Sequence, residues 1–408
     1  MIFCVFEGIA IMDKKLFVLL LYFCVNRTST PLKYVLEGSM LEAVVLRLVQ
    51  IVSISFIIYF LYKSKKQCNM KPLRYIGSII IFMFFPSLLS GSVHHYIAFA
   101  YPAIAYSCLI LYAGQTYRRL LLFVDTVSSY YIFISGLNLY LTLFAPTLFG
   151  DFYLLGGENF VGYTLLIGVI YNVLYTYMTG RKFKLWVCIA IYVINTLVVW
   201  SGGAVIGGFV LLVCLLFPFV NKIITKTPLN MLILAYAGIY LVIVIFNSTG
   251  ILDGTFVEYI VVDILGKDMT FTKRTYIWLM ALVIILDNPF IGHGIPSDGN
   301  FVQWVSPIGE IAYKSAHNQI LQSMYEGGFV LILLIILSII YLSNRLKTCK
   351  NDKINNLFKA GILGLFFMFL VEAPSMHFYY EIFILACAVV FVINEENFIK
   401  KQNAKIQA

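Results

Sequence analysis

The feature that most constrains this chain is a succession of apolar stretches along nearly its whole length. Many of them approach the ~20 residues that an α-helix needs to cross the hydrocarbon core of a bilayer. We assign twelve spans with approximate ends: Leu16–Val25, Leu41–Tyr62, Tyr75–Leu89, Tyr96–Ala113, Leu120–Ala145, Phe160–Thr179, Leu185–Trp200, Ala204–Val220, Leu229–Phe246, Phe329–Ser343, Leu357–Val371 and Tyr379–Asn394. With 61% hydrophobic and 12% charged residues, the chain has too little polar surface to cover a soluble globule. The sequence therefore predicts an all-α, polytopic membrane protein of about twelve transmembrane helices, with residues 1–408 forming a single integral membrane domain.

The positive charges indicate how these spans are oriented. If the N-terminus is cytoplasmic, 22 of the 29 Lys and Arg fall in cytoplasmic loops, six fall in the opposite loops, and Arg47 lies within a span. Loops rich in Lys and Arg remain on the cytoplasmic side. The sequence thus predicts a bacterial inner-membrane protein with both termini in the cytoplasm, and the excess positive charge gives no support to a nucleic-acid partner. The first stretch, after Lys14-Lys15, also fits a signal segment, cleaved or uncleaved.

The longest connection between spans, residues 247–328, is predicted to be a large extracytoplasmic loop. Loops of this length usually carry function. Within it, Tyr276–Leu286 is apolar but too short to cross, which predicts an amphipathic or re-entrant helix at the membrane surface, ended by Asn288-Pro289. The segment Ile291–Ser306, rich in Gly, Pro, Asp and Ser, is expected to be irregular.

A second short helix is expected near the end of this loop. Ser315 is a suitable N-cap, which predicts a helix over Ala316–Glu326 with His317 in its first turn. Gly327-Gly328 then separates this helix from the next span.

His317 is the first candidate for chemistry. A neutral histidine can accept a proton near pH 7, and the N–H groups of a helix N-terminus attract anions. Asn318 and Gln322, four residues apart, would form with it a polar face for hydroxyl-rich ligands. The alternative is a structural histidine that hydrogen-bonds within its own loop.

Two arginines are the candidates for binding an anion. Arg274 and Trp278 are four residues apart, so a helix places the cation beside the indole; the alternative is a membrane-interface anchor. Arg47 lies about seven residues inside the second span from its outer end. Because a cation inside a membrane must face a partner or a wet cavity, Arg47 is placed to meet an anion at the outer leaflet. It could instead snorkel to the headgroups or pair with an acid such as Glu42.

The remaining polar residues predict no metal or cofactor. Asp125, Glu372 and Glu381 fall near the ends of their spans and are interpreted as boundary residues rather than proton carriers. The eight cysteines contain no CxxC pair, and neither an HExxH motif nor a phosphate-binding glycine loop is present.

Four short segments together resemble the O-antigen ligase and polymerase family. They are Arg274 to Trp278, Asn288 to Gly294, His317 to Leu321, and Gly327-Gly328. Family members carry, in this order and in a large periplasmic loop, an Arg and a Trp on a short helix, an Asn-Pro followed by a Gly-x-Gly turn, and a His-Asn before a glycine. The motifs cover about sixty residues, and the multi-span topology extends the likeness along the chain.

The resemblance implies a membrane glycosyltransferase whose donor is an undecaprenyl-diphosphate-linked oligosaccharide. The reaction would be inverting and metal-independent, at the outer face of the inner membrane. By position, Arg274 would bind the diphosphate and His317 would act at the acceptor hydroxyl; Arg47 as a second phosphate clamp is our own hypothesis. The sequence departs from the family at Ser201-Gly202-Gly203, where members often carry an Arg or Lys beside the turn. Either Lys273 or Lys314 would compensate for this missing cation, or the donor would be held differently.

Several functions fit this pattern. A repeat-unit polymerase of O-antigen or capsule is favoured over a ligase of the same family, because the acceptor side shows no added feature and such polymerases are diverse Tyr-, Phe- and Ile-rich chains of this size. A chain-length regulator and a flippase would be its protein partners. A twelve-span polysaccharide or lipid transporter needs a polar site near the midplane and usually internal repeats, whereas the polar candidates here gather outside. A structural membrane subunit would leave the long loop unexplained.

Overall fold

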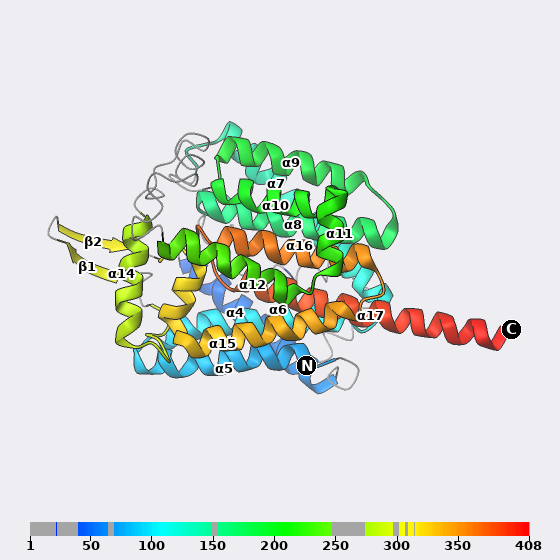
Figure 1. Cartoon of the computed structure of the whole chain (residues 1–408), viewed down its shortest axis with the longest axis horizontal. Coiled ribbons are helices and arrows are strands. Elements are labelled where there is room, and N and C mark those ends of the chain that lie inside the picture. The colour runs from blue at the N-terminus through cyan, green and yellow to red at the C-terminus, as the bar shows by residue number, and fades with distance from the viewer. Residues whose placement is uncertain are drawn as a thin grey trace.

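The computed structural model describes residues 22, 40–63, 69–148, 153–246, 274–296, 302–306, 309–313 and 315–407. Its elements are α4 (Met40–Lys63), α5 (Lys71–Leu89), α6 (Val93–Ala113), α7 (Tyr117–Phe144), α8 (Glu158–Thr179), α9 (Phe183–Val199), α10 (Gly202–Leu216), α11 (Pro218–Lys226), α12 (Leu229–Tyr240), the π-helix η2 (Leu241–Phe246), α14 (Arg274–Asp287), β1 (Val302–Ser306), β2 (Gly309–Tyr313), α15 (Gln319–Lys347), α16 (Asp352–Phe369) and α17 (His377–Gln407). Among these, the long helices lie side by side as a bundle (Figure 1). α14 lies across one end of the bundle, and α17 extends beyond the opposite end.

The described part is helical apart from one hairpin, in which β1 and β2 pair antiparallel. The expectation of irregular structure up to Ser306 is therefore wrong for residues 302–306. The register places Val302 opposite Tyr313 and Trp304 opposite Ile311, residue types that favour strands. A strand forms only with its partner, and that partner lies beyond the segment from which irregular structure was expected.

Six helices of the described part are long and apolar enough to cross a membrane, or seven if the bent pair α10 and α11 counts as one span. These helices indicate a multi-pass membrane protein, whereas twelve spans and the full extent of the long loop stay predictions. The expected span Ala204–Val220 is broken, because α10 and α11 meet at 88°. Pro218 begins α11, and Phe217 before it has the extended backbone that a following proline favours.

α10 illustrates how the helices meet lipid on one face and protein on the other. Large apolar side chains on its outer face are exposed: Val205, Phe209, Leu212 and Leu216. Its inner face carries Gly207, which lies so close to α16 that a Cβ added at Gly364 would stand 2.9 Å from the Gly207 carbonyl oxygen. Small residues allow membrane helices to approach closely, and van der Waals packing then holds them together.

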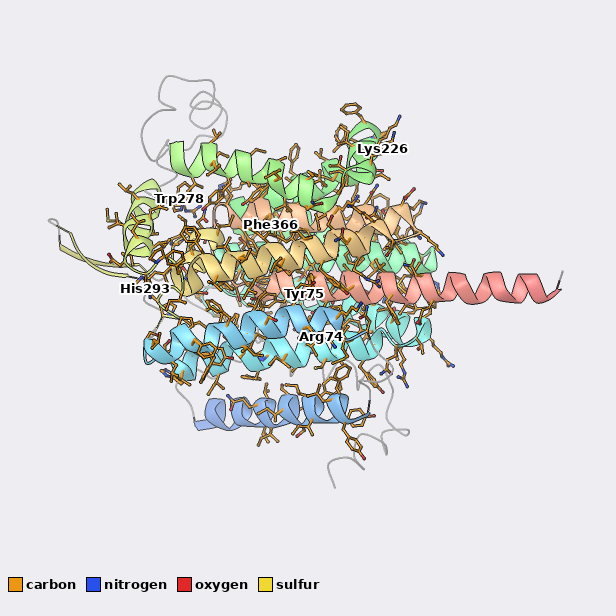
Figure 2. The ribbon with its side chains drawn as sticks, turned by 60° about the horizontal axis from the view of Figure 1, so that its bottom comes forward. Arg74, Tyr75, Lys226, Trp278, His293 and Phe366 are labelled. Atoms are coloured by element: carbon orange, nitrogen blue, oxygen red, sulfur yellow. The ribbon has the colours of Figure 1, made fainter. Side chains whose placement is uncertain are left out.

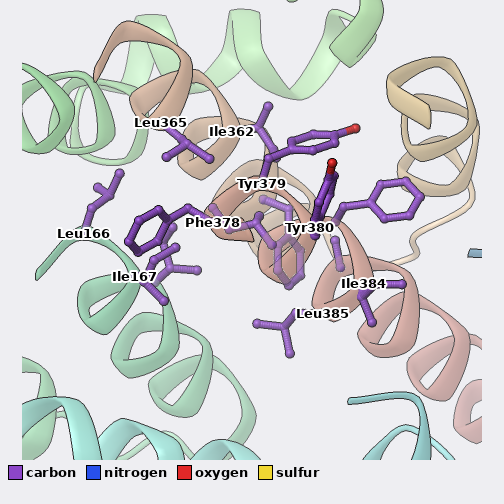
Figure 3. Close-up of a cluster of buried hydrophobic side chains, with 14 of the residues drawn as sticks. Leu166, Ile167, Ile362, Leu365, Phe378, Tyr379, Tyr380, Ile384 and Leu385 are labelled. Atoms are coloured by element: carbon purple, nitrogen blue, oxygen red, sulfur yellow. The ribbon is translucent and has the colours of Figure 1, made fainter. Parts of the chain in front are cut away.

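α17 is buried at the centre of the bundle over its first turns. Figure 3 shows Phe378 and Tyr379 of α17 beside Leu166 of α8 and Ile362 of α16, and all four side chains are buried. The segment just before α17 is thereby fixed relative to α8 and α16. That segment carries Glu372.

Polar contacts hold one end of the bundle together. The Tyr117 hydroxyl donates to the Met178 carbonyl oxygen at 2.9 Å, and the buried Lys359 ammonium donates to the carbonyl of Ile224 at 2.9 Å. These contacts place the starts of α7 and α16 beside the ends of α8 and α11. Lys and Arg gather at this basic end, defined by Arg118, Lys182, Lys226 and Lys347. Figure 2 shows Lys226 at the end opposite Trp278 and His293, so the basic charges lie far from α14.

Candidate active site

Three charged or titratable side chains meet at the end of the bundle opposite the basic end. Arg274 Nη2 lies 2.5 Å from Glu372 Oε1, and His317 Nδ1 lies 3.2 Å from Glu372 Oε2. The three side chains come from the first residue of α14, the residues before α15 and the loop after α16. Glu372 is 10% exposed, Arg274 24% and His317 36%. A nearly buried carboxylate therefore joins two partly accessible groups, an arrangement that can bind an anion and accept a proton in one place.

His317 has an unusual backbone. Its φ is +46°, in the left-handed region that histidine occupies more often than most residues but at a cost of about 1–3 kcal/mol. The expectation that His317 lies in the first turn of a helix starting at Ala316 is wrong, because α15 begins at Gln319. The physical reason is that Asn318 rather than Ser315 caps this helix. Non-glycine residues in such conformations cluster at functional sites.

Asn318 connects three helices behind the histidine. Its Oδ1 accepts hydrogen bonds from the backbone N–H groups of Ile320 at 3.1 Å and Leu321 at 3.0 Å, and from the Tyr240 hydroxyl at 3.1 Å. Its Nδ2 donates to the Leu370 carbonyl oxygen at 2.9 Å. Since Leu370 is two residues before the site glutamate and Asn318 follows the histidine, this fully buried amide sets the two catalytic candidates beside each other.

Replacing Asn318 by alanine is expected to cost roughly 1 kcal/mol of stability for the lost cap and to reduce activity as well. Asn351→Ala is the matched control, since Asn351 caps α16 through the same contacts to Lys353 N and Ile354 N but lies at the basic end. Thermal unfolding in detergent should show both variants destabilised. Activity in membranes, measured per amount of folded protein, should fall only in Asn318→Ala. Equal activity of the two variants would contradict the role given to Asn318.

Gln322 is turned inward as well. Its Oε1 accepts from the Ala316 backbone N–H at 3.0 Å, and its Nε2 donates to Glu326 Oε1 at 2.8 Å. The side chain is 6% exposed. It thus fixes the residue before the histidine.

Trp278 lies one turn after Arg274 on α14 and is completely buried. Its neighbours on the inward side of the helix, Ile277, Ala281 and Ile285, are buried too. The inner face of α14 therefore rests on the bundle and holds the arginine at the edge of the site. Arg47 falls within α4, but its side chain is not among those the structure describes, and Lys273 and Lys314 lie outside the described residues.

The turn after α14 is tied to α15. The Asn288 side-chain amide donates to the Gly292 carbonyl oxygen at 2.6 Å and closes the turn, which confirms that α14 ends at this point. The His293 backbone N–H donates to the Tyr325 carbonyl oxygen at 2.7 Å, and the two rings stack with centroids 5.0 Å apart. The Asn-Pro and Gly-His-Gly segments thus position α14, and with it Arg274, against α15.

Two glycines permit this close contact. Gly328, with φ +60°, interrupts α15, where the sequence predicts a break, and the Phe329 N–H donates to the Pro289 carbonyl oxygen at 2.8 Å. Gly292 has φ +69°, and a Cβ there would stand 2.5 Å from the backbone nitrogen of Gly327. Each position requires glycine for both its backbone conformation and its space.

Glu372 is the residue that the sequence-based reasoning missed. An acid close to the outer end of a span, followed by Ala373-Pro374, fits a boundary residue as well as a catalytic one. The signal that could have singled it out is its predicted position on the same side of the membrane as the long loop.

At Ser201-Gly202-Gly203, the serine accepts a hydrogen bond from the Ala204 N–H and caps α10.

A match to a known protein family covers most of this site. Residues 160–336 match a family model described as O-antigen ligase. The resemblance to the O-antigen ligase family is confirmed. The matched residues include Arg274, His317 and the turn between them, whereas Glu372 and Arg47 fall outside them. No curated protein matches the chain.

The O-antigen ligase family gives the cluster its chemical setting. The similarity of this region to O-antigen ligases suggests a membrane enzyme of the ligase or polymerase type that uses lipid-linked oligosaccharides. Among the described residues, no three His, Cys, Asp or Glu side chains gather as metal ligands would. Arg274, Glu372 and His317 are the candidate groups for this chemistry.

Proposed function

We propose that this protein is a polysaccharide polymerase, a glycosyltransferase that joins undecaprenyl-diphosphate-linked repeat units of O-antigen or capsule by an inverting, metal-independent reaction. The observation that carries the proposal is the contact of Glu372 with Arg274 and His317, two residues that lie in a region similar to O-antigen ligases. Transfer of a sugar from a diphosphate needs two groups, a cation that binds the anion and a general base.

The reaction takes place at the outer face of the bacterial inner membrane. The positive-inside rule assigns the basic end, with Arg118 and Lys226, to the cytoplasm, together with both chain termini. The cluster at the opposite end then faces outwards, where a lipid-linked donor presents its sugars. α14, lying across this end, would rest at the outer surface of the membrane.

His317 acts as the general base. Its Nδ1 faces the Glu372 carboxylate, so Nε2 is the nitrogen that takes the proton of the acceptor hydroxyl. The hydroxyl oxygen attacks the anomeric carbon of the donor from the side opposite the diphosphate, which inverts that centre. A carboxylate on the far ring nitrogen orients the imidazole and stabilises its protonated form, as in hydrolase triads.

Arg274 binds the leaving diphosphate. When the bond between the anomeric carbon and the phosphate oxygen breaks, its electron pair leaves with the phosphate, and the guanidinium compensates the developing charge. Arg47 would clamp the diphosphate from α4, and Trp278 supports the arginine from beneath. Asn318 and Gln322, whose amides bond within the protein, position His317 rather than bind sugar.

A ligase is the second candidate, favoured by the description of the matching family. A ligase would move the finished chain onto another acceptor, whereas a polymerase adds it to one more repeat unit. We favour the polymerase on the grounds given by the sequence. It would work with a flippase that delivers the lipid-linked units and with a regulator of chain length.

The test is the surface polysaccharide of a deletion strain that carries wild type, Arg274→Ala or Arg118→Ala at equal membrane levels. Wild type and Arg118→Ala should restore long chains, and Arg274→Ala should leave single repeat units, because removing one charge-stabilising donor slows transfer roughly 10²–10³-fold. Arg118 is exposed at the basic end and serves as the matched control.

The pattern of failure separates the alternatives. Single attached units in the deletion strain support a polymerase, and long chains that accumulate on their carrier lipid support a ligase. Lipid-linked units trapped in the cytoplasmic leaflet would indicate a transporter. Full rescue by Arg274→Ala would show that the site lies elsewhere.

A further inference from the structure

We propose that Glu372 couples donor binding to activation of the base. Its carboxylate occupies the place on Arg274 that a phosphate oxygen of the donor takes. When the donor displaces the carboxylate from Arg274, Glu372 pairs with His317 instead. This inference rests on the proposed function. It assigns Glu372 the role of a positioning residue that exchanges partners during the reaction.

The geometry of the cluster supports an exchange. One carboxylate serves both neighbours, since Oε1 lies 2.5 Å from Arg274 Nη2 and 3.4 Å from His317 Nδ1, while Oε2 lies 3.2 Å from the same Nδ1. The shorter contact is to the arginine. Carboxylate and phosphate oxygens bind a guanidinium in the same way, so the diphosphate and Glu372 compete for one donor.

Charge and burial determine the outcome of this competition. A diphosphate on Arg274 would place negative charge beside the carboxylate, and like charges at this distance repel. Because Glu372 is 10% exposed, it cannot exchange its partner simply for water, and a buried charge without a partner is costly. His317 is already within reach of both oxygens. Pairing of the displaced carboxylate with the imidazole favours the protonated form of His317.

A hydroxyl near the pair offers Glu372 a second donor. Tyr163 on α8 is completely buried, and its hydroxyl has no hydrogen-bond partner within the described part of the chain. The same side chain interacts electrostatically with both Glu372 and Arg274. A buried hydroxyl with no partner among the described residues is unusual, and the Glu372 carboxylate is an acceptor that interacts with it electrostatically.

The consequence is that Glu372 supports proton transfer to His317 when the donor is bound and is held by Arg274 before the donor binds. With an empty site, Arg274 holds the carboxylate and reduces its pull on the imidazolium. Donor binding removes that competitor. The acceptor hydroxyl is thus deprotonated only beside a bound donor.

The test measures binding and transfer separately on the full-length protein in nanodiscs. Glu372→Gln removes the competing charge, so undecaprenyl diphosphate should bind about tenfold more tightly, the equivalent of ~1.4 kcal/mol. Single-turnover transfer should slow roughly 10- to 100-fold, because the imidazolium loses its carboxylate. Asp287→Asn, which removes an exposed charge at the far end of α14, should change neither quantity.

Tighter binding together with slower transfer supports the exchange, and a merely structural residue would not move the two quantities in opposite senses. Unchanged or weaker binding by Glu372→Gln overturns it. Should that variant fail to accumulate, Glu372→Asp, with its shorter side chain, is expected to bind at least as tightly as wild type and to transfer more slowly; weaker binding would overturn the inference. If wild type itself does not bind undecaprenyl diphosphate, the proposed function fails instead.

Discussion

Replacing His317 by alanine is expected to slow sugar transfer roughly 10²–10⁴-fold while donor binding changes little, because a positioned general base contributes about that much to a rate. The measurement is single-turnover transfer with purified protein, alongside binding of undecaprenyl diphosphate. His317→Asn should lose activity to the same extent. Asparagine accepts the left-handed backbone at this position, so the second variant separates chemistry from backbone conformation.

His94→Ala is the matched control. His94 is exposed on α6 and lies at the same end of the bundle, yet it does not touch the Arg274–Glu372 pair in the described structure. Its replacement should leave transfer at the wild-type rate. A missing general base should leave far less than about a tenth of the wild-type rate. If His317→Asn kept more than about a tenth of that rate, the histidine would be structural.

Gly292→Ala should lower the amount of folded protein in the membrane severely. The methyl group would stand 2.5 Å from the Gly327 nitrogen and 2.6 Å from the Tyr325 carbonyl oxygen, and backbone atoms cannot move aside as a flexible side chain can. Alanine also disfavours the φ of +69°. We expect a loss of more than about 3 kcal/mol, measured as a lower unfolding temperature in detergent and a lower membrane level.

Gly180→Ala isolates the clash from the backbone conformation. Gly180 ends α8 with φ +75°, and a Cβ there would meet nothing within 4 Å. This variant should therefore lose only the ~1 kcal/mol that a left-handed alanine costs. Equal losses at the two glycines would show that the contact between the turn after α14 and α15 is not what demands Gly292.

The Glu372–Arg274–His317 cluster depends on two sets of connections. Asn318 joins α12, α15 and the end of α16, while the glycine turn joins α14 to α15. None of these connections involves the reacting groups directly. The chemistry of a site at the end of a bundle therefore depends on how helix ends are capped and crossed, and the capping and turn variants test that dependence.

Local signals in the sequence were enough to find the helices and several of their ends. Apolar runs of sufficient length became helices because only a helix satisfies its own backbone hydrogen bonds in lipid. Asn288-Pro289 ended α14, and Gly328 interrupted α15, because each acts through its own backbone. The break at Pro218 had the same kind of signal, but the apolar pattern on both sides concealed it.

Pairings between distant residues could be known only from the tertiary structure. Ser315 and Asn318 are both good caps by residue type, and Asn318 caps α15 while it also bonds to Tyr240 and Leu370, residues far away in the sequence. Glu372 has the same local pattern whether it faces water or an arginine. The sequence by itself determined a helical membrane protein and the asymmetry of its charges, since these follow from composition and from where the charges lie, and it carries the motifs that resemble the O-antigen ligase family. Only helix packing decided which carboxylate joins Arg274 to His317. Arg274 and Glu372 are 98 residues apart in the chain, and no local pattern encodes their contact.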